Sequence, residues 1–147
     1  VTKVLAIAND RPCIEAKYSI TNESDRPIRS RFGVEFCFNF LAGDADDRYY
    51  KINGEKPAPA NLRSAAAHEQ TTEFSIVDKW LGLEARVAIA EPTGLWRFPI
   101  ETVSLSEAGF ERLYQGSVLF AHCLLNLSPS ASHTLTFRYE ILPCPTQ

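Results

Sequence analysis

The sequence of 147 residues contains no methionine, and its first residue is Val1. We therefore expect an excised fragment or a processed product, for which a missing signal peptide carries no information about targeting. The sequence also lacks any run of Lys or Arg, and its net charge of −3 gives no electrostatic basis for binding nucleic acid. No apolar stretch approaches the roughly 18 residues that a membrane-spanning helix needs. Neither nucleic acid nor a membrane is thus an expected partner.

The four cysteines lack the spacing of a metal or redox motif. Cys13, Cys37, Cys123 and Cys144 form no C-x-x-C pair, and no His stands at zinc-ligand spacing from them. A chain of this length can bury a core without a disulfide framework. We therefore expect free thiols, with Cys123 as a small buried hydrophobic residue, and a cytoplasmic location. The sequence predicts no cofactor and no metal site.

Alternation of apolar and polar residues dominates the chain and predicts β-strands. The clearest case is the segment 32–40, in which every second residue is apolar: Phe32, Val34, Phe36, Phe38 and Phe40. Burying five such side chains contributes on the order of 8–15 kcal/mol of gross transfer free energy, so we expect this face to lie on the core. Glu35 and Asn39 occupy the opposite face, which we expect to be a polar surface.

Further alternating segments predict strands at 13–20, 71–78, 83–90 and 133–142. Residues 117–127 are apolar at both parities, which predicts a central strand with both faces buried. The segment 53–69 has no periodicity and predicts a long loop, with one helical turn near 65–68. About nine or ten strands and no helix of three turns predict one all-β domain over residues 1–147, an antiparallel β-sandwich or barrel.

Residues 94–116, GLWRFPIETVSLSEAGFERLYQG, concentrate aromatic and charged side chains. The alternation of Phe98 and Ile100 against Glu101 and Val103 predicts one strand of a hairpin, and residues 106–109 are typical of its turn. In the second strand, the alternation directs Phe110, Arg112 and Tyr114 to one face and Glu111, Leu113 and Gln115 to the other. Such a hairpin suits a binding surface or a packed interface.

This hairpin carries a family resemblance. Residues 96–116 (WRFPIETVSLSEAGFERLYQG), 32–50 (FGVEFCFNFLAGDADDRYY) and 76–89 (IVDKWLGLEARVAI) resemble the C-terminal β-domain of glycoside hydrolase family 57, the family of α-amylases and 4-α-glucanotransferases. The three segments follow the expected order within residues 32–116, a span of over half of the chain. It implies an antiparallel β-sandwich of the galactose-mutarotase-like supersandwich type, placed after a catalytic barrel in a larger enzyme. The family's nucleophile and acid/base lie on that barrel, so the resemblance implies no catalytic residue in this chain.

Glycoside hydrolysis requires two carboxylates that flank the bond, and Glu101, Glu107 and Glu111 are the candidates. Because fold-level analogy is no evidence of a site, we interpret them instead as ion-pair partners of Arg97 and Arg112.

His122 lies in the apolar segment 117–127 and would be the acid in a mutarotase-like sugar epimerase. We favour a hydrogen-bonded core or interface histidine. Asp44, Asp46 and Asp47 could hold Ca²⁺ through carboxylate oxygens, but a solvated turn is the favoured interpretation.

Sugars stack on flat aromatic rings while polar side chains bind their hydroxyl groups. The competing role of such rings is in the core or a domain interface, which we favour for Trp96 and Tyr114. Both roles stay open for Trp80 and for the pair Tyr49 and Tyr50. The candidate carbohydrate-binding or interface residues are Trp96, Glu101, Glu107, Phe110, Glu111, Arg112, Tyr114, Gln115, Trp80, Tyr49, Tyr50, Glu35 and Asn39.

These observations predict a non-catalytic C-terminal accessory domain of an α-glucan-processing enzyme. We expect it to pack on the N-terminal catalytic barrel of the same chain and to contribute to binding an α-glucan such as starch, glycogen or a maltooligosaccharide. The alternatives are a stand-alone carbohydrate-binding module and a mutarotase-like sugar epimerase. Both hydrolysis and glucan transfer stay open for the parent enzyme.

Overall fold

The structure, a computed structural model, describes residues 1–107 and 109–145, which form eight strands and no helix. The strands are β1 (Thr2–Ile7), β2 (Cys13–Thr21), β3 (Ile28–Phe38), β4 (Arg48–Ile52), β5 (Ala66–Asp78), β6 (Leu83–Ser106), β7 (Gly109–Leu127) and β8 (Ser132–Pro143). Within the described part of the chain there is accordingly no helix long and apolar enough to cross a membrane.

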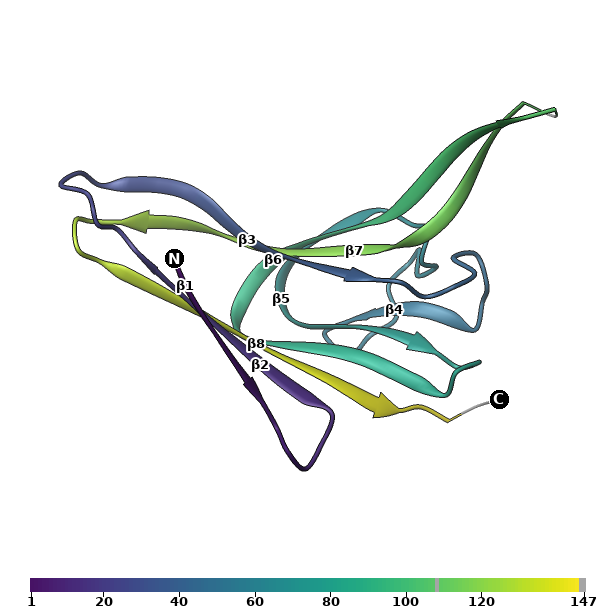
Figure 1. Cartoon of the computed structure of the whole chain (residues 1–147), viewed down its shortest axis with the longest axis horizontal. Coiled ribbons are helices and arrows are strands. Elements are labelled where there is room, and N and C mark those ends of the chain that lie inside the picture. The colour runs from purple at the N-terminus through teal and green to yellow at the C-terminus, as the bar shows by residue number, and fades with distance from the viewer. Residues whose placement is uncertain (108, 146–147) are drawn as a thin grey trace.

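All strand pairs are antiparallel, and the sheet folds over into two layers (Figure 1). The strand order of one layer is β1-β2-β8-β6-β5-β4, and the other contains β3, β7, the second half of β6 and the start of β5. β6 belongs to both layers, because its residues 83–89 pair with β8 and its residues 94–106 pair with β7. This arrangement confirms the predicted antiparallel β-sandwich, whereas its finer assignment to the supersandwich type stays a prediction.

The core lies between the two layers. Val34 and Phe38 of β3 are buried, and the Phe36 ring lies 5.4 Å from the Phe74 ring of β5 and 5.3 Å from the Phe137 ring of β8. Phe32, Phe36 and Phe40 are half-buried against the same cluster, although the strand ends at Phe38. The prediction that these alternating residues face the core is therefore confirmed.

The predicted strand number was wrong because two pairs of predicted strands are continuous. β6 runs for 24 residues through Pro92. The proline lies where the register with β5 shifts, between the pairs Glu73–Ala88 and Thr71–Thr93, and it disrupts no regular ladder there. β7 is likewise one strand of 19 residues, but its last part does not have both faces buried, since Leu124 is 64% exposed.

The predicted helical turn near 65–68 is also wrong. Ala66, Ala67 and His68 begin β5 and pair with residues 95–97 of β6. Alanine has a high helix propensity, but the long-range pairing with β6 outweighs this local preference.

Candidate functional sites

Beyond Ile100, β6 and β7 leave the sandwich and pair with each other as a projecting hairpin (Figure 1). We call this hairpin, residues 101–107 and 109–114, the arm. Its turn lies between Ser106 and Gly109, as the sequence predicts, although Ala108 lies outside the described residues. Gly109 has a φ of 113°, a backbone conformation that favours glycine.

The arm exposes large apolar side chains. Val103, Leu105, Phe110 and Leu113 have exposed fractions of 63%, 75%, 81% and 63%. The pairing of Leu105 with Phe110 places both on the face that Val103 also occupies, whereas Leu113 points to the opposite face. Apolar side chains gathered in this way mark an interaction surface.

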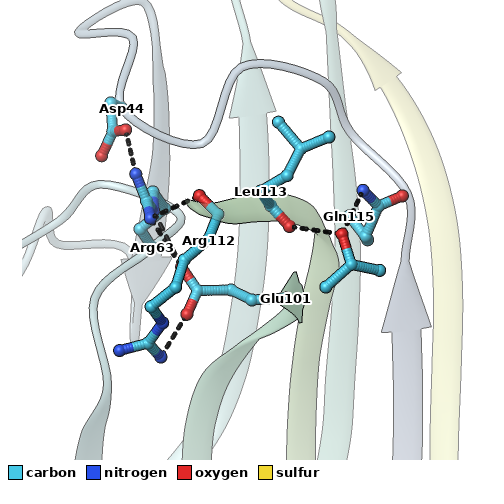
Figure 2. A network of polar contacts seen from close by, with 7 residues as sticks. Asp44, Arg63, Glu101, Arg112, Leu113 and Gln115 are labelled. Atoms are coloured by element: carbon cyan, nitrogen blue, oxygen red, sulfur yellow. Dashed lines mark hydrogen bonds and ion pairs between the residues drawn. The ribbon is translucent and has the colours of Figure 1, made fainter. Parts of the chain in front are cut away.

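A network of charges holds the base of the arm (Figure 2). Arg63 of the loop before β5 donates to Oε1 of Glu101 at 2.8 Å, and Arg112 pairs with the other carboxylate oxygen. Arg63 also pairs with Asp44 at 2.8 Å. The hydrogen bond from Arg63 and the charge of Arg112 hold the pKa of the Glu101 carboxyl below its usual value. Arg63 thus joins its own loop to the loop of Asp44 and to the arm.

A β-bulge separates the arm from the sandwich. The register of β6 and β7 shifts between Ile100 and Glu101, which leaves Gln115 as the extra residue of β7. The side chain of Gln115 donates to Oγ1 of Thr102 at 3.3 Å (Figure 2). A bulge of this kind increases the local twist, which helps to turn the arm away from the sheet.

Tyr114 ties the base of the arm to the core. Its hydroxyl group lies 2.7 Å from Oγ of Ser117, and the Tyr50 hydroxyl group lies 2.6 Å from the same oxygen. Gly43 packs against the same region, where an added Cβ would lie 2.7 Å from atoms of both Arg63 and Tyr114. A larger residue at this position would clash with both side chains, so glycine lets the loop 41–47 pack against the base of the arm.

The structure excludes Tyr50 as a residue that stacks on a sugar. It is fully buried, and its hydroxyl also donates to the Leu62 carbonyl at 3.0 Å. Burial raises its pKa to about 12. Its neighbour Tyr49 is half-buried, with the Lys56 ammonium 4.2 Å from the ring centre, so only Tyr49 of this pair stays a candidate.

The other predicted site residues lie in different places. Trp96 is 41% exposed on the outer face of β6, and Trp80 is 68% exposed in the turn between β5 and β6, with the Arg48 guanidinium 5.4 Å from its ring centre. Glu107 and Glu111 are exposed on the arm, and Glu35 and Asn39 are exposed on and just after β3. The structure therefore gathers the candidate residues of the segment 101–115 at the arm and its base. It places Tyr49 and Trp80 apart from them, where the start of β4 pairs with the end of β5.

One proposed role of a charged residue requires correction. Arg97 forms no ion pair with Glu101; it is 1% exposed and donates to the carbonyls of Pro59 and Ser64 instead. In the acidic loop, Asp44 pairs with Arg63, and Asp47 accepts a hydrogen bond from Arg48. Within residues 1–107 and 109–145, no three His, Cys, Asp or Glu side chains are grouped to hold a metal ion.

The four cysteines are free thiols, as predicted. Cys123 is only half-buried, however, and Cys13 is the buried one. Burial raises the pKa of the Cys123 thiol, which favours its protonated form.

A polar hollow that the sequence analysis missed lies where β5, β6 and β7 meet. Its volume is about 320 Å³, and its polar lining residues are Arg31, Glu69, Gln70, Thr93 and His122. His122 is 5% exposed, and its Nδ1 lies 2.7 Å from Nη1 of Arg31. No periodicity connects these residues, because four strands, β3, β5, β6 and β7, supply them. The larger hollow of about 430 Å³ between β1, β2 and β3 has a mostly apolar lining.

The geometry of His122 does not favour the epimerase alternative. Such an enzyme needs a histidine that is open to solvent and within reach of a carboxylate. Glu69 lines the same hollow, but the polar group that contacts the His122 ring is the Arg31 guanidinium. Burial and the charge of Arg31 lower the pKa of His122, so the ring is a poor proton donor at neutral pH.

Residues 1–137 match the family model described as "Alpha-amylase/4-alpha-glucanotransferase, C-terminal". Among curated proteins, the chain is similar to Alpha-amylase 1 of Dictyoglomus thermophilum, with 35% identity over 139 residues, which are 95% of this chain and 20% of that protein. Among solved structures, it is similar to the 4-alpha-glucanotransferase of Thermococcus litoralis, with a TM-score of 0.62 and 21% identity over 94% of this chain and 18% of that one.

A second solved structure with the same fold is the Slr1438 protein of Synechocystis sp. PCC 6803. Its TM-score is 0.58 at 15% identity, and the match covers 90% of this chain and 51% of that one. At these identities the two structures show the fold alone. The chain spans about a fifth of the length of both the amylase and the glucanotransferase.

Proposed function

Because this chain belongs to the family of C-terminal domains of α-amylases and 4-α-glucanotransferases, we propose that it packs through its arm on the catalytic barrel of the same enzyme. In this role it stabilises the barrel and does not carry the catalytic carboxylates. The observation that carries the proposal is the exposure of Val103, Leu105 and Phe110 on one face of the arm. Fully covering one such side chain contributes about 1.5–3 kcal/mol, so one partner surface would gain several kcal/mol.

The chemistry of the arm supports a protein interface. Aromatic residues and arginine are enriched at the centres of interfaces, and the arm combines Phe110 with Arg112, whose side chain is 69% exposed. Glu101 already compensates the charge of Arg112, so covering this arginine would not leave an unpaired charge. The network at the base also fixes the direction of the arm before docking, which lowers the entropy cost of association.

The parent enzyme is proposed to act on α-glucans such as starch, glycogen or maltooligosaccharides. The family match supports this substrate class, and hydrolysis and glucan transfer are both compatible with it. A cytoplasmic location is also proposed, which the four free cysteines support because thiols persist in reducing compartments.

The test compares the full-length enzyme with this chain alone. Leu105→Ser combined with Phe110→Ser should lower the Tm and activity of the full-length enzyme and leave the Tm of the isolated chain unchanged. The matched control is Leu81→Ser, which removes an apolar side chain that is 52% exposed at the turn between β5 and β6. Equal Tm values of the full-length enzyme with and without the double substitution would refute docking through the arm.

A stand-alone carbohydrate-binding module is the second candidate function. The 68% exposure of Trp80 favours it, since an exposed indole offers a face for sugar stacking. The Arg48 guanidinium covers part of that ring, however, which reduces the area available to a sugar. Maltoheptaose binding by the isolated chain that Trp80→Ala abolishes would support this function over docking alone.

A further inference from the structure

We propose that the polar hollow between β5, β6 and β7 binds one glucose unit of an α-glucan, beside the Trp96 ring. The choice of glucose rests on the proposed function, whereas the lining itself indicates a neutral ring with several hydroxyl groups. At about 320 Å³ the hollow lies at the lower end of the size range of small-molecule sites. Four features of the structure point to a ligand here.

The first feature is an irregular backbone. Between the pairs His68–Leu95 and Thr71–Thr93, two residues of β5 oppose one residue of β6, so Glu69 and Gln70 form a bulge against Gly94. Gln70 has a φ of 53°, which costs free energy in a residue other than glycine. Bulges next to functional sites redirect side chains, and this one brings the side chains of two consecutive residues to the hollow.

The second feature is the orientation of His122. An added Cβ on Gly94 would lie 2.3 Å from the His122 ring, so the ring rests on the glycine backbone and forms the floor of the hollow. Arg31 can only donate hydrogen bonds, so the Nδ1 atom that it contacts at 2.7 Å must accept. The neutral ring then carries its proton on Nε2, which lies 3.5 Å from the same guanidinium nitrogen. Because that nitrogen only donates, the Nε2 proton is left to donate to a sugar hydroxyl group.

The third feature is a pair of opposite charges that do not neutralise each other directly. Within the described residues, neither Arg31 nor Glu69 takes part in an ion pair, although both line the hollow. A guanidinium donates parallel hydrogen bonds and a carboxylate accepts them, so neighbouring hydroxyl groups of a sugar satisfy both. Glu69 would repel an anion and Arg31 a cation, which leaves a neutral polyol as the fitting ligand.

The fourth feature is the aromatic surface next to the hollow. The Trp96 ring centre lies 4.5 Å from that of His122 and 5.7 Å from that of Phe120. Arg31 lies 5.2 Å from the centre of the Trp96 ring, so it links the indole to the polar lining. The indole, at 41% exposure, offers apolar area for the faces of a pyranose ring.

The test is a titration of the ¹⁵N-labelled chain with maltose and maltoheptaose, followed by NMR. We expect the indole signal of Trp96 and the ring signals of His122 to shift, and the indole signal of Trp80 to stay in place. Trp80→Phe assigns the two indole signals. Glu69→Gln and Arg31→Met should each weaken binding at least tenfold. Glu107→Gln on the arm is the matched control and should bind with unchanged affinity.

Three outcomes would overturn the proposal. One is the absence of shifts at Trp96 and His122 up to the solubility limit of the sugars. The second is a response confined to Trp80, and the third is an equal response to inorganic phosphate, which would indicate an anion site. These results are separable from the docking test, because Glu69→Gln leaves the arm intact, and the serine substitutions in the arm leave the hollow intact.

Discussion

Arg97 has the largest side chain among the fully buried residues of the described chain, and no Asp or Glu of residues 1–107 and 109–145 pairs with it. Its guanidinium group donates to the Pro59 carbonyl at 2.6 Å, the Ser64 carbonyl at 3.2 Å and Nε2 of His68 at 3.1 Å. Arg97 thus anchors the irregular segment before β5 onto β6. Arg97 and Tyr50 together help to hold the long loop that the sequence predicts.

Arg97→Met should destabilise the isolated chain by about 3 kcal/mol, because it removes the charged donor of the hydrogen bonds to the Pro59 and Ser64 carbonyl groups. Urea unfolding measures the loss, and limited proteolysis should show new cleavage within residues 57–65. Arg112→Met is the comparison: its side chain is 69% exposed, and we expect a loss of less than about 1 kcal/mol. Equal losses for the two variants would contradict the anchoring role of Arg97.

The pH dependence of stability should follow His68 and His122. Burial lowers the pKa of both rings below 6.5 in the folded chain, and Arg97 and Arg31 lower them further. The unfolded chain then binds more protons, so the free energy of unfolding should fall as the pH drops from about 7.5 to 5.5. Glu101 and Glu140 have pKa values lowered from 4.5, so their contribution is lost only at more acidic pH.

His68→Gln separates the contribution of the His68 ring to the pH dependence of stability from the contributions of the other titratable groups. Its amide oxygen can accept the hydrogen bond from Arg97 but does not titrate, so the slope between pH 7.5 and 5.5 should become shallower. Urea midpoints at a series of pH values measure this slope. A slope that is unchanged in His68→Gln and in His122→Gln would show that other groups control stability in this range.

The arm illustrates what alternation can and cannot predict about an element. The faces of both strands follow the sequence pattern, as the pairs Leu105–Phe110 and Val103–Arg112 show. Alternation is local, however, and it could not show that β6 continues into the arm from the other layer of the sandwich. Alternation also could not predict that the apolar face of the arm is exposed, because the same sequence pattern occurs whether or not a partner covers that face.

Shortening the arm should leave the isolated chain folded. Replacing residues 103–112 with Asn-Gly would close a two-residue turn between Thr102 and Leu113, which are paired in β6 and β7. The free energy of unfolding should change by less than about 1 kcal/mol, because the deleted side chains are mostly exposed. Urea unfolding followed by circular dichroism measures the change. Loss of the cooperative transition would mean that the arm is part of the folding unit.

For the molecule as a whole, the sequence predicted the all-β sandwich and the strand faces that point into its core. It did not predict which strands pair with each other. Phe36 and Phe137 face each other across the core as their alternation indicates, since burial of alternating residues determines which face of a strand points inwards. The hollow at His122 could not be found in this way. It depends on a bulge at Gln70 and on a close approach to Gly94, and both follow from long-range pairing rather than from a local motif.

The whole chain, taken alone, should release no reducing sugar from starch or maltoheptaose. Glycoside hydrolysis needs one carboxyl group that stays protonated and a second carboxylate about 5–9.5 Å away, with the substrate between them. Glu101 cannot be that acid, because Arg63 and Arg112 occupy both of its oxygens and lower its pKa. Glu107 and Glu111 lie exposed on the arm, whereas a catalytic pair must flank the bond of a bound substrate. A reducing-sugar assay of the purified chain, with the full-length enzyme as positive control, measures this. Activity of the isolated chain that disappears in Glu101→Gln would contradict the accessory role and assign catalysis to the arm.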